Sequence, residues 1–352
     1  MSDFDQQKLE QLQGKVLADV TGAIGTLLCY MGDQSGVYDV LDAAGPCTAE
    51  TLADKAGIDA RYAREWLSAN AAAGYVSYNP DDETFWLSPE QALIFAREGQ
   101  PMNMQGFFQA VVGQYETHEK AIDVFKSGAG RPWGEHSSCC FCGTDRFFRP
   151  GYAANLVEHW LPALDGVVDR LTAGGTVADV GCGRGSSTVL LAEAFPQSQV
   201  HGFDFHEASI EDARAKAAEA GLNNVRFEVA KAKEFNSGPY DLICVFDALH
   251  DMGDPVGAAA HMREALKPDG RLMLVEPLAG DTLKENLHLL GALFYSFSTI
   301  VCTPASKAQE VGLALGAQAG QKRLTEVLTQ AGFSSVRRAT ETPTNMVLEA
   351  RP

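Results

Sequence analysis

A glycine-rich turn between an apolar run and a helical pattern is the segment best suited to hold a ligand. Residues 177–185 read VADVGCGRG and precede the helical pattern. Glycines let the backbone approach a ligand closely, and the helix start offers free N–H groups. A second apolar run ends in an acid about 20 residues downstream, where nucleotide-binding folds place a partner for ribose hydroxyls. We therefore predict a nucleotide-type cofactor site containing Asp179, Gly181, Gly183 and Asp204.

A histidine after the fourth predicted strand is the candidate general base. Residues 246–255 read FDALHDMGDP. In a doubly wound sheet, a loop that follows a strand lies on the ligand side. The imidazole of His250, with an ordinary pKa near ~6.5, is suited to accept a proton there. Glu276 ends the next strand and is placed to accept a hydrogen bond from the other ring nitrogen. Asp251 is either a helix cap or a second orienting acid, and both roles stay open.

Three cysteines lie close together in residues 136–142, which read HSSCCFC. Structural zinc usually takes four ligands as two separated pairs, and the sequence shows no second pair. A three-thiol trap for a soft metalloid is the alternative. We expect Cys139, Cys140 and Cys142 to be buried thiols in an ordered loop that holds no metal.

The elements that position these residues follow an alternating pattern from about residue 151 onward. Alternation of strands and helices favours a parallel sheet covered on both faces. The predicted strands are 176–180, 199–204, 225–229, 242–246, 271–276, 334–339 and 346–349, and the predicted helices are 186–195, 207–220, 256–266 and 324–331. Residues 267–270 predict a turn. Residues 278–320 are too long for a plain crossover and predict a helical lid over an acceptor site.

The first 100 residues predict two capped helices and a hairpin, the pattern of a winged helix-turn-helix. Helical spacing runs from residue 16 to 41, and Thr48 and Asp59 are expected to cap two further helices. The predicted hairpin strands are 75–78 and 84–87. We place a mainly α domain at 1–100, a helical linker that lines the active site at 101–165, with a linker stretch at 131–152, and the α/β domain at 166–352.

The composition of the chain limits the classes of partner that we expect it to bind. The net charge of −18 disfavours nucleic acid and anionic lipid. Residues 1–100 hold six Lys and Arg against 16 Asp and Glu, so this domain is poorly made to neutralise phosphates. We find no signal peptide and no apolar stretch near the ~20 residues of a membrane span, and we expect a cytoplasmic protein. The eight cysteines are then expected to be reduced.

Two motifs carry a resemblance to a known family. The glycine spacing after Asp179 resembles motif I of class I S-adenosylmethionine-dependent methyltransferases. Residues 249–254, LHDMGD, look like the L-H-D-W-S-D signature of small-molecule O-methyltransferases. Over residues 15–350 the chain resembles bacterial members that carry a winged-helix domain and are often labelled transcriptional regulators. The matching blocks are residues 147–152, 178–183, 249–255 and 315–320, and residues 331–333 resemble a late A-G-F of the small-molecule O-methyltransferases.

The resemblance implies a Rossmann-like, seven-stranded domain, S-adenosylmethionine as cofactor, and His250 as the general base with Glu276 beside it. We assign Phe205, Ala232 and Phe246 to the cofactor as well. Residues 229–233, VAKAK, lack the acid that the family usually places near adenine, so backbone and Ala232 are expected to serve there. Gln321 lies near where plant members have a second glutamate. The aromatic residues Trp133, Phe148, Tyr152 and Tyr295 either line the acceptor pocket or belong to the core.

We therefore predict methyl transfer to a small organic acceptor, at oxygen, by a homodimer paired through the N-terminal domain. Two alternatives stay open. One is an S- or metalloid methyltransferase that uses the three cysteines. The other is a winged-helix transcription regulator in which the cofactor fold acts as a sensor. The acidic N-terminal domain favours dimerisation over DNA binding.

Overall fold

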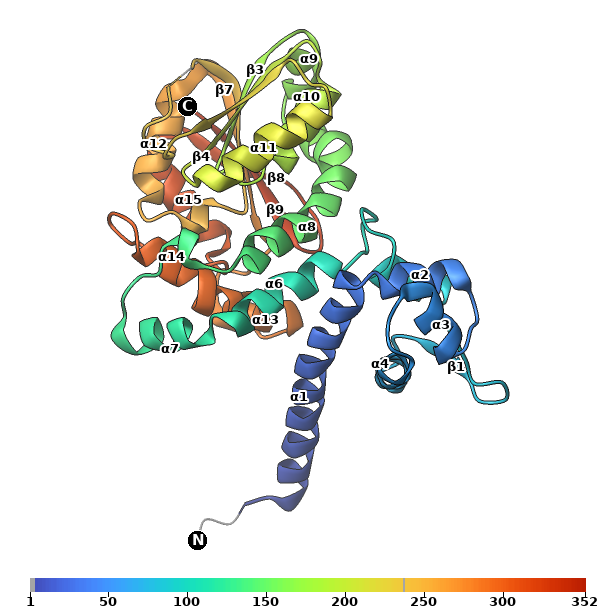
Figure 1. Ribbon diagram of the computed structural model, residues 1–352. Coiled ribbons are helices and arrows are strands. Elements are labelled where there is room, and N and C mark those ends of the chain that lie inside the picture. Colours follow the sequence, from blue (N-terminus) through green and yellow to red (C-terminus); the bar gives the residue numbers. More distant parts are fainter. Residues whose placement is uncertain (1–3, 237) are drawn as a thin grey trace. The chain divides into compact units, whose positions relative to one another are not determined.

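The computed structural model describes residues 4–236 and 238–352, which form two compact units (Figure 1). The first unit comprises Met1–Glu116 and Ser137–Pro150, and the second comprises Thr117–His136 and Gly151–Pro352. Helix α8, Ser138–Asn155, contributes residues to both units.

The first unit has the winged-helix elements that the sequence predicts. Thr48 and Asp59 cap their helices through side-chain oxygens that accept backbone N–H groups, as expected. The helical spacing predicted over 16–41 is divided between two helices, because Gly36 adopts a positive φ of 68° and separates them. The elements are α1 (Gln6–Gln34), α2 (Val37–Ala44), α3 (Ala49–Ala56), α4 (Ala60–Ala72), β1 (Ser77–Asn79), β2 (Thr84–Trp86), α5 (Pro89–Phe95) and α6 (Gln105–Glu116).

The stretch 131–152, predicted as a linker stretch within a helical segment, is mostly helical. Most of it belongs to α8, which packs against α6 at unusually short range. A Cβ on Gly143 would lie 2.3 Å from the backbone nitrogen of Ala110, and one on Gly106 would lie 2.5 Å from backbone atoms of Arg146. Glycine therefore lets the two helices meet, and this packing stabilises a helix whose own sequence includes Pro150.

The second unit contains a seven-stranded sheet in the order β5-β4-β3-β6-β7-β9-β8. Strand β9 runs antiparallel to both of its neighbours, and the remaining pairs are parallel. This confirms the predicted fold class. The strands are β3 (Thr176–Val180), β4 (Gln199–Asp204), β5 (Val225–Val229), β6 (Tyr240–Phe246), β7 (Leu266–Pro277), β8 (Ser335–Glu341) and β9 (Asn345–Arg351). The turn predicted at 267–270 is wrong: these residues lie within β7, where the register with β6 shifts.

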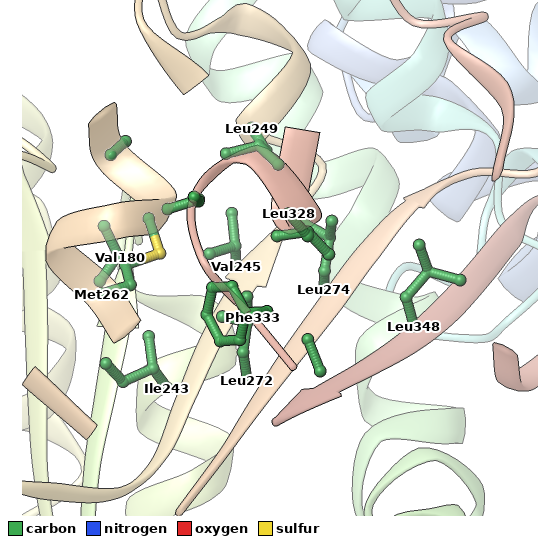
Figure 2. Packing of buried hydrophobic residues seen from close by; sticks show 14 of the residues in the cluster. Val180, Ile243, Val245, Leu249, Met262, Leu272, Leu274, Leu328, Phe333 and Leu348 are labelled. Atoms are coloured by element: carbon green, nitrogen blue, oxygen red, sulfur yellow. The ribbon is translucent and has the colours of Figure 1, made fainter. Parts of the chain in front are cut away.

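The helices of this unit pack on the sheet and bury its apolar side chains. Figure 2 shows Met262 of one helix and Leu328 of another gathered with Phe333 against Val245 and Leu274 of the strands. The loops that contain the predicted cofactor and base residues follow the carboxyl ends of the parallel strands. The helices are α7 (His118–Ser127), α9 (Val167–Thr172), α10 (Ser186–Ala194), α11 (Glu207–Glu219), α12 (Pro255–Ala265) and α15 (Gly320–Gln330), with short turns η1 (Trp133–Glu135), η2 (Leu156–Trp160), η3 (Leu161–Ala163) and η4 (Leu249–Asp251).

The segment predicted as a lid is helical. It contains η5 (Leu283–Asn286), α13 (Leu289–Phe297), η6 (Ser298–Cys302) and α14 (Thr303–Lys307). The continuous run Leu289–Lys307 has 19 residues and a mean hydropathy of 1.4, which is long and apolar enough to cross a membrane by length and composition. The expectation that no stretch approaches this length is therefore wrong. Ser306 in this run donates a hydrogen bond to the Met252 carbonyl, as a helix packed within a folded unit does.

Candidate active site

The glycine-rich turn is tied directly to the acid at the end of β4. The N–H of Gly181 donates to the Phe203 carbonyl at 2.8 Å, and the N–H of Gly183 donates to Asp204 Oδ2 at 2.9 Å. The N–H of His206 donates to Asp204 Oδ1 at 2.8 Å. Both glycines have positive φ, 76° and 50°, which side-chain-bearing residues rarely adopt. Each carboxylate oxygen of Asp204 retains lone-pair capacity, so the predicted contact with ribose hydroxyls remains available.

The side chain of Asp179, on β3, is hydrogen-bonded to the first turn of α10. Its Oδ2 accepts hydrogen bonds from Ser187 Oγ at 2.6 Å and Thr188 Oγ1 at 2.7 Å. Among the described residues, none donates to its buried Oδ1. Burial raises the pKa of Asp179 to about 6 despite the two hydrogen bonds. The side chain predicted to bind the cofactor therefore has a structural role, with one oxygen left for a further donor.

Four neighbouring strands each carry an acid at or beside the carboxyl end. They are Asp204 on β4, Asp179 on β3, Asp247 directly after β6 and Glu276 on β7. Burial raises the pKa of Asp204, and it raises that of Asp247 to about 7. Buried carboxylates are stabilised in their charged form by a nearby cation. This edge of the sheet is thus chemically suited to a cofactor that carries positive charge, such as a sulfonium or an ammonium group.

His250 and Glu276 form a buried dyad. Their exposed fractions are 3% and 1%. The Nδ1–H of His250 donates to Glu276 Oε2, and the backbone N–H of His250 donates to Oε1 at 3.3 Å. One carboxylate therefore fixes both the ring and the backbone of the same residue. Burial lowers the pKa of His250, but the carboxylates of Glu276 and Asp251 outweigh it and hold this pKa well above its usual range.

The second ring nitrogen of His250 faces two further polar groups. Asp251 Oδ1 lies 3.3 Å from His250 Nε2, and the Sγ of the buried Cys302 lies within 4.8 Å of donor atoms of both side chains. Burial raises the pKa of Cys302 to about 12, so the thiol is protonated at neutral pH. Sequence reasoning missed Cys302, which lies more than 50 residues away in the segment predicted as a lid. Asp251 proves to face the ring rather than to cap a helix.

Asp247 is a second site residue that sequence reasoning missed. Its Oδ2 accepts a hydrogen bond from the Tyr152 hydroxyl at 3.0 Å, and its Oδ1 accepts one from Asn345 Nδ2 at 2.8 Å. Its φ is 48°, an uncommon conformation for a residue other than glycine and one that clusters at functional sites. An acid directly after a buried strand, as at Asp204, is the signal that could have found it.

The remaining predicted residues differ in their placement. Phe246 is buried with its ring centroid 5.2 Å from that of Tyr152, and Trp133 packs in the small cluster that contains Cys302. Phe205 is half exposed and Tyr295 of α13 is partly exposed. The predicted pocket residues do not form one group. Phe148 belongs to the first unit, where its ring packs against Phe147, while Trp133, Tyr152 and Tyr295 belong to the second.

The loop after β5 lacks the acid that the resembling family usually places near adenine. This loop is held by ion pairs. Lys233 Nζ lies 2.6 Å from Asp254 Oδ2, and Lys231 Nζ lies 3.3 Å from Glu234 Oε1. Ala232 packs against the edge of the main core between them. Both lysine charges are therefore balanced by neighbouring carboxylates.

Gln321, which lies near where plant members have a second glutamate, accepts a hydrogen bond from Arg338 at 2.8 Å.

The three clustered cysteines lie in α8 and not in a loop, which corrects the sequence interpretation. Cys140 is buried, and Cys139 Sγ lies 3.2 Å from the Tyr30 hydroxyl and 3.7 Å from Glu116 Oε1. Cys139 and Cys142 are three residues apart and share a helix face. Among the described residues, the group of donors close enough to hold a metal is His250, Asp251 and Cys302.

Comparisons with known proteins agree with both units. Residues 171–332 match the family described as a methyltransferase domain, and residues 23–97 match the Rv2258c-like winged HTH domain. Aklanonic acid methyltransferase DauC from Streptomyces sp. strain C5 is 34% identical over 127 residues, which are 35% of this chain and 58% of the relative. The chain thus spans less than two thirds of that relative's length.

Solved structures show the same fold over the whole chain. The mitomycin 7-O-methyltransferase MmcR is 18% identical with a TM-score of 0.70, and the match covers 99% of this chain and all of that one. Human N-acetylserotonin methyltransferase, solved in complex with S-adenosylmethionine, is 16% identical with a TM-score of 0.68, covering 100% and 99% of the two chains. At such low identity the similarity establishes the architecture and leaves the acceptor open.

Proposed function

We propose that this chain methylates an oxygen of a small organic acceptor. The chain belongs to the S-adenosylmethionine-dependent methyltransferases with an N-terminal winged-helix domain. The observation that supports this most directly is the buried His250–Glu276 dyad in the loop after β6. Gly181 packs beside this loop, because a Cβ on Gly181 would lie 2.9 Å from that of Ala248. The base and the cofactor turn are therefore neighbours within one unit.

In this proposal the bound cofactor supplies a methyl group on a positively charged sulfur. His250 Nε2 accepts the proton that an acceptor hydroxyl loses as its oxygen attacks. Glu276 holds the ring through Nδ1 and stabilises the imidazolium that forms. The carboxylates of Glu276 and Asp251 raise the pKa of His250, so the ring must first lose its own proton. A cationic cofactor nearby favours that loss.

Replacing the base tests the proposal. His250→Ala should lower turnover of a phenolic acceptor by about 10²–10⁴, the usual contribution of general base catalysis. His159→Ala is the matched control because His159 is exposed on the surface. Calorimetry with S-adenosylhomocysteine should give near-normal affinity for both variants. A near-normal rate of His250→Ala on phenols and alcohols would contradict the proposal, and sensitivity confined to thiols would favour S-methylation.

The cofactor site is tested separately at Asp204. Asp204→Ala should weaken binding of S-adenosylhomocysteine, because hydrogen bonds to a charged group contribute about 1.5–3 kcal/mol. It also leaves the N–H groups of Gly183 and His206 without their acceptor. Asp204→Asn keeps an acceptor oxygen for one of these donors and should lose less affinity. Unchanged affinity of the alanine variant, measured by calorimetry, would remove Asp204 from the cofactor site.

We further propose that the N-terminal unit pairs with a second copy of the chain and does not bind DNA. Helix α1 has an apolar stripe, at intervals of three or four residues, whose members are 38–61% exposed: Leu9, Leu12, Val16, Val20, Ile24, Leu27 and Met31. Such spacing is typical of a helix that packs lengthwise against another helix. The arginines of α4 are already paired, Arg61 with Glu65 and Arg64 with Glu50.

A charge placed in the stripe tests the pairing. Ile24→Glu buries a carboxylate in the proposed interface and should convert a dimer to a monomer in light scattering. Gln11→Glu is the matched control, because Gln11 lies on the opposite side of α1 by helical geometry. A wild-type protein that is monomeric and shifts a DNA fragment at physiological salt would reverse this proposal.

A further inference from the structure

We propose that His250 Nε2, Asp251 Oδ1 and Cys302 Sγ form a binding site for zinc, and that zinc bound there inhibits the enzyme by occupying the nitrogen needed for proton removal. The donor atoms of the three residues all lie within 4.8 Å of one another. His250 and Cys302 are buried, and the Asp251 side chain is 22% exposed. The inhibitory part of this inference depends on the proposed role of His250 as base.

The ring orientation of His250 is what leaves one nitrogen for the metal. Nδ1 is engaged by Glu276, as in metal sites where a carboxylate orients a ligating imidazole. Nε2 points toward Asp251 Oδ1 at 3.3 Å. Ligands of a tetrahedral zinc, at about 2.0–2.3 Å from the metal, stand about 3.3–3.8 Å apart. The cluster therefore needs only small side-chain movements to close around one ion.

The chemical types of the three donor atoms favour zinc over other divalent ions. A thiolate and an imidazole bind borderline-soft ions such as zinc, whereas magnesium and calcium require oxygen ligands. Three protein ligands leave the fourth tetrahedral position open. In the part of the chain that the structure describes, Asp251 Oδ1 is buried and accepts no hydrogen bond of good geometry, so a metal would also satisfy this oxygen.

The site competes with catalysis because metal and proton require the same lone pair. Zinc on Nε2 prevents His250 from accepting the acceptor's proton. Binding of zinc requires Cys302 to release its thiol proton and the protonated ring of His250 to release its Nε2 proton, both to solvent, as the S–Zn and N–Zn bonds form with no change of oxidation state. The effect is reversible, since a chelator that removes zinc returns the nitrogen to the base.

The binding test uses the full-length protein after treatment with a chelator. Titration with Zn²⁺ alone, against a chromophoric competitor, should show one tight site per chain. Titration with Co²⁺ should produce the near-ultraviolet absorption of a thiolate bound to cobalt. Cys302→Ala should remove this absorption and weaken zinc binding at least tenfold, because even loss of a supporting residue outside the ligand shell costs about 10–100-fold. Cys139→Ala is the matched control, since it removes a thiol that lies beside Glu116.

Calorimetry with S-adenosylhomocysteine shows that each variant is folded. Cys302→Ser provides a second variant should the alanine substitution disturb packing. One tight site that persists in Cys139→Ala and is lost in both Cys302 variants supports the inference. Absence of a tight site, or its loss in Cys139→Ala instead, overturns it, and neither result bears on whether His250 is the base.

The inhibition test measures methyl transfer as each protein is titrated with zinc, relative to its own rate without metal. The wild type should be inhibited near one equivalent, and Cys302→Ala should need at least tenfold more zinc. The role of His250 as base is tested separately by His250→Ala, whereas zinc that binds through Cys302 and leaves the rate unchanged would overturn the inhibitory role. Activation by zinc would overturn it as well, because the metal would then assist the acceptor.

Discussion

His250 has an acidic neighbour at each ring nitrogen, and the two neighbours act differently. Glu276 is hydrogen-bonded to Nδ1 and to the backbone, so it sets orientation and charge together. Asp251 lies 3.3 Å from Nε2, the nitrogen that we propose accepts the proton. Because both carboxylates raise the pKa of the ring, we expect the free enzyme to be most active above the ordinary pKa of histidine, near ~6.5.

Glu276→Gln separates charge from orientation. An amide oxygen still accepts the Nδ1–H, but the negative charge is lost, so the pKa of His250 should fall. The rate with a neutral acceptor rises with pH as the base deprotonates, and this rise in kcat/KM should therefore move to lower pH in the variant. Glu276→Asp keeps the charge and should leave the rise nearer its wild-type pH. A profile of Glu276→Gln identical to that of the wild type would show that the carboxylate does not set the pKa.

The two kinds of site residue differed in how far the sequence could predict them. His250 and Glu276 were predictable because each lies at or just after the end of an apolar run, where the sheet geometry defines the ligand side. Cys302 was not, because it comes to His250 through the packing of a helical segment whose position no local pattern encodes. Asp247 was missed although it occupies the same kind of position as Asp204.

At the scale of elements, the loop that carries His250 is held by the segment that follows α14. Gln309 Nε2 donates to the Asp251 carbonyl at 2.8 Å and to the Ala305 carbonyl at 3.0 Å, and its Oε1 accepts the Gly253 N–H at 3.1 Å. Backbone pairing adds to this, since the Leu313 N–H donates to the Gly253 carbonyl. One amide side chain thereby joins the loop that carries His250 to the helix next to Cys302.

Gln309→Ala should loosen this loop. It leaves the part-buried N–H of Gly253 without its partner, at a cost of about 1–3 kcal/mol, and removes an exposed hydrogen bond to the Asp251 carbonyl. We expect a lower melting temperature and a fall in kcat of about tenfold, because misplacing a catalytic group reduces the rate strongly. Affinity for S-adenosylhomocysteine should change little. Gln330→Ala at the exposed end of α15 is the control, and equal effects of both substitutions would contradict a positioning role.

The elements themselves show where sequence patterns suffice. The predicted strands of the sheet were confirmed: β3 and β6 are buried along nearly all of their length, whereas β5 and β8, at the two edges of the sheet, are partly exposed. Helix α8 was not predicted, since its cysteines, glycines and Pro150 are weak helix formers and its stability comes from close packing on α6. Residues 267–270 belong to β7 but have no partner in β6, because the register passes from Tyr240–Leu266 directly to Leu242–Arg271 and the Pro-Asp-Gly sequence lies in this irregular stretch.

At the scale of the whole molecule, buried charge makes stability depend on pH. Asp247 has a pKa of about 7 in the folded protein, and that of His250 lies well above its usual range. For both groups the folded state binds a proton more tightly than the unfolded state. The stability linked to them is present at low pH and is lost as pH rises through the folded-state pKa. Buried His136 and partly buried His201, whose pKa values are lowered to about 4, act in the opposite direction, but only below pH ~6.5.

The melting temperature of the protein without cofactor should therefore fall by a few degrees between pH 6.5 and 8.5. One unit of pKa is worth about 1.4 kcal/mol, and 1 kcal/mol moves the midpoint of a domain of this size by about 2–4 °C. Asp247→Asn removes one titrating group and should flatten the decline. Asp269→Asn, at an exposed position, should not. Calorimetric scans of the three proteins across this range give the comparison.

Cofactor binding should oppose the decline in a charge-dependent manner. S-adenosylmethionine has a positively charged sulfur that S-adenosylhomocysteine lacks, and a cation favours the ionised form of Asp247. The stabilisation by S-adenosylmethionine should therefore grow from pH 6.5 to 8.5 by more than that by S-adenosylhomocysteine. The difference between the two ligands should shrink in Asp247→Asn. Identical pH dependence for both ligands would show that the acids along the strand ends do not sense the charge on sulfur, and would assign them to structure alone.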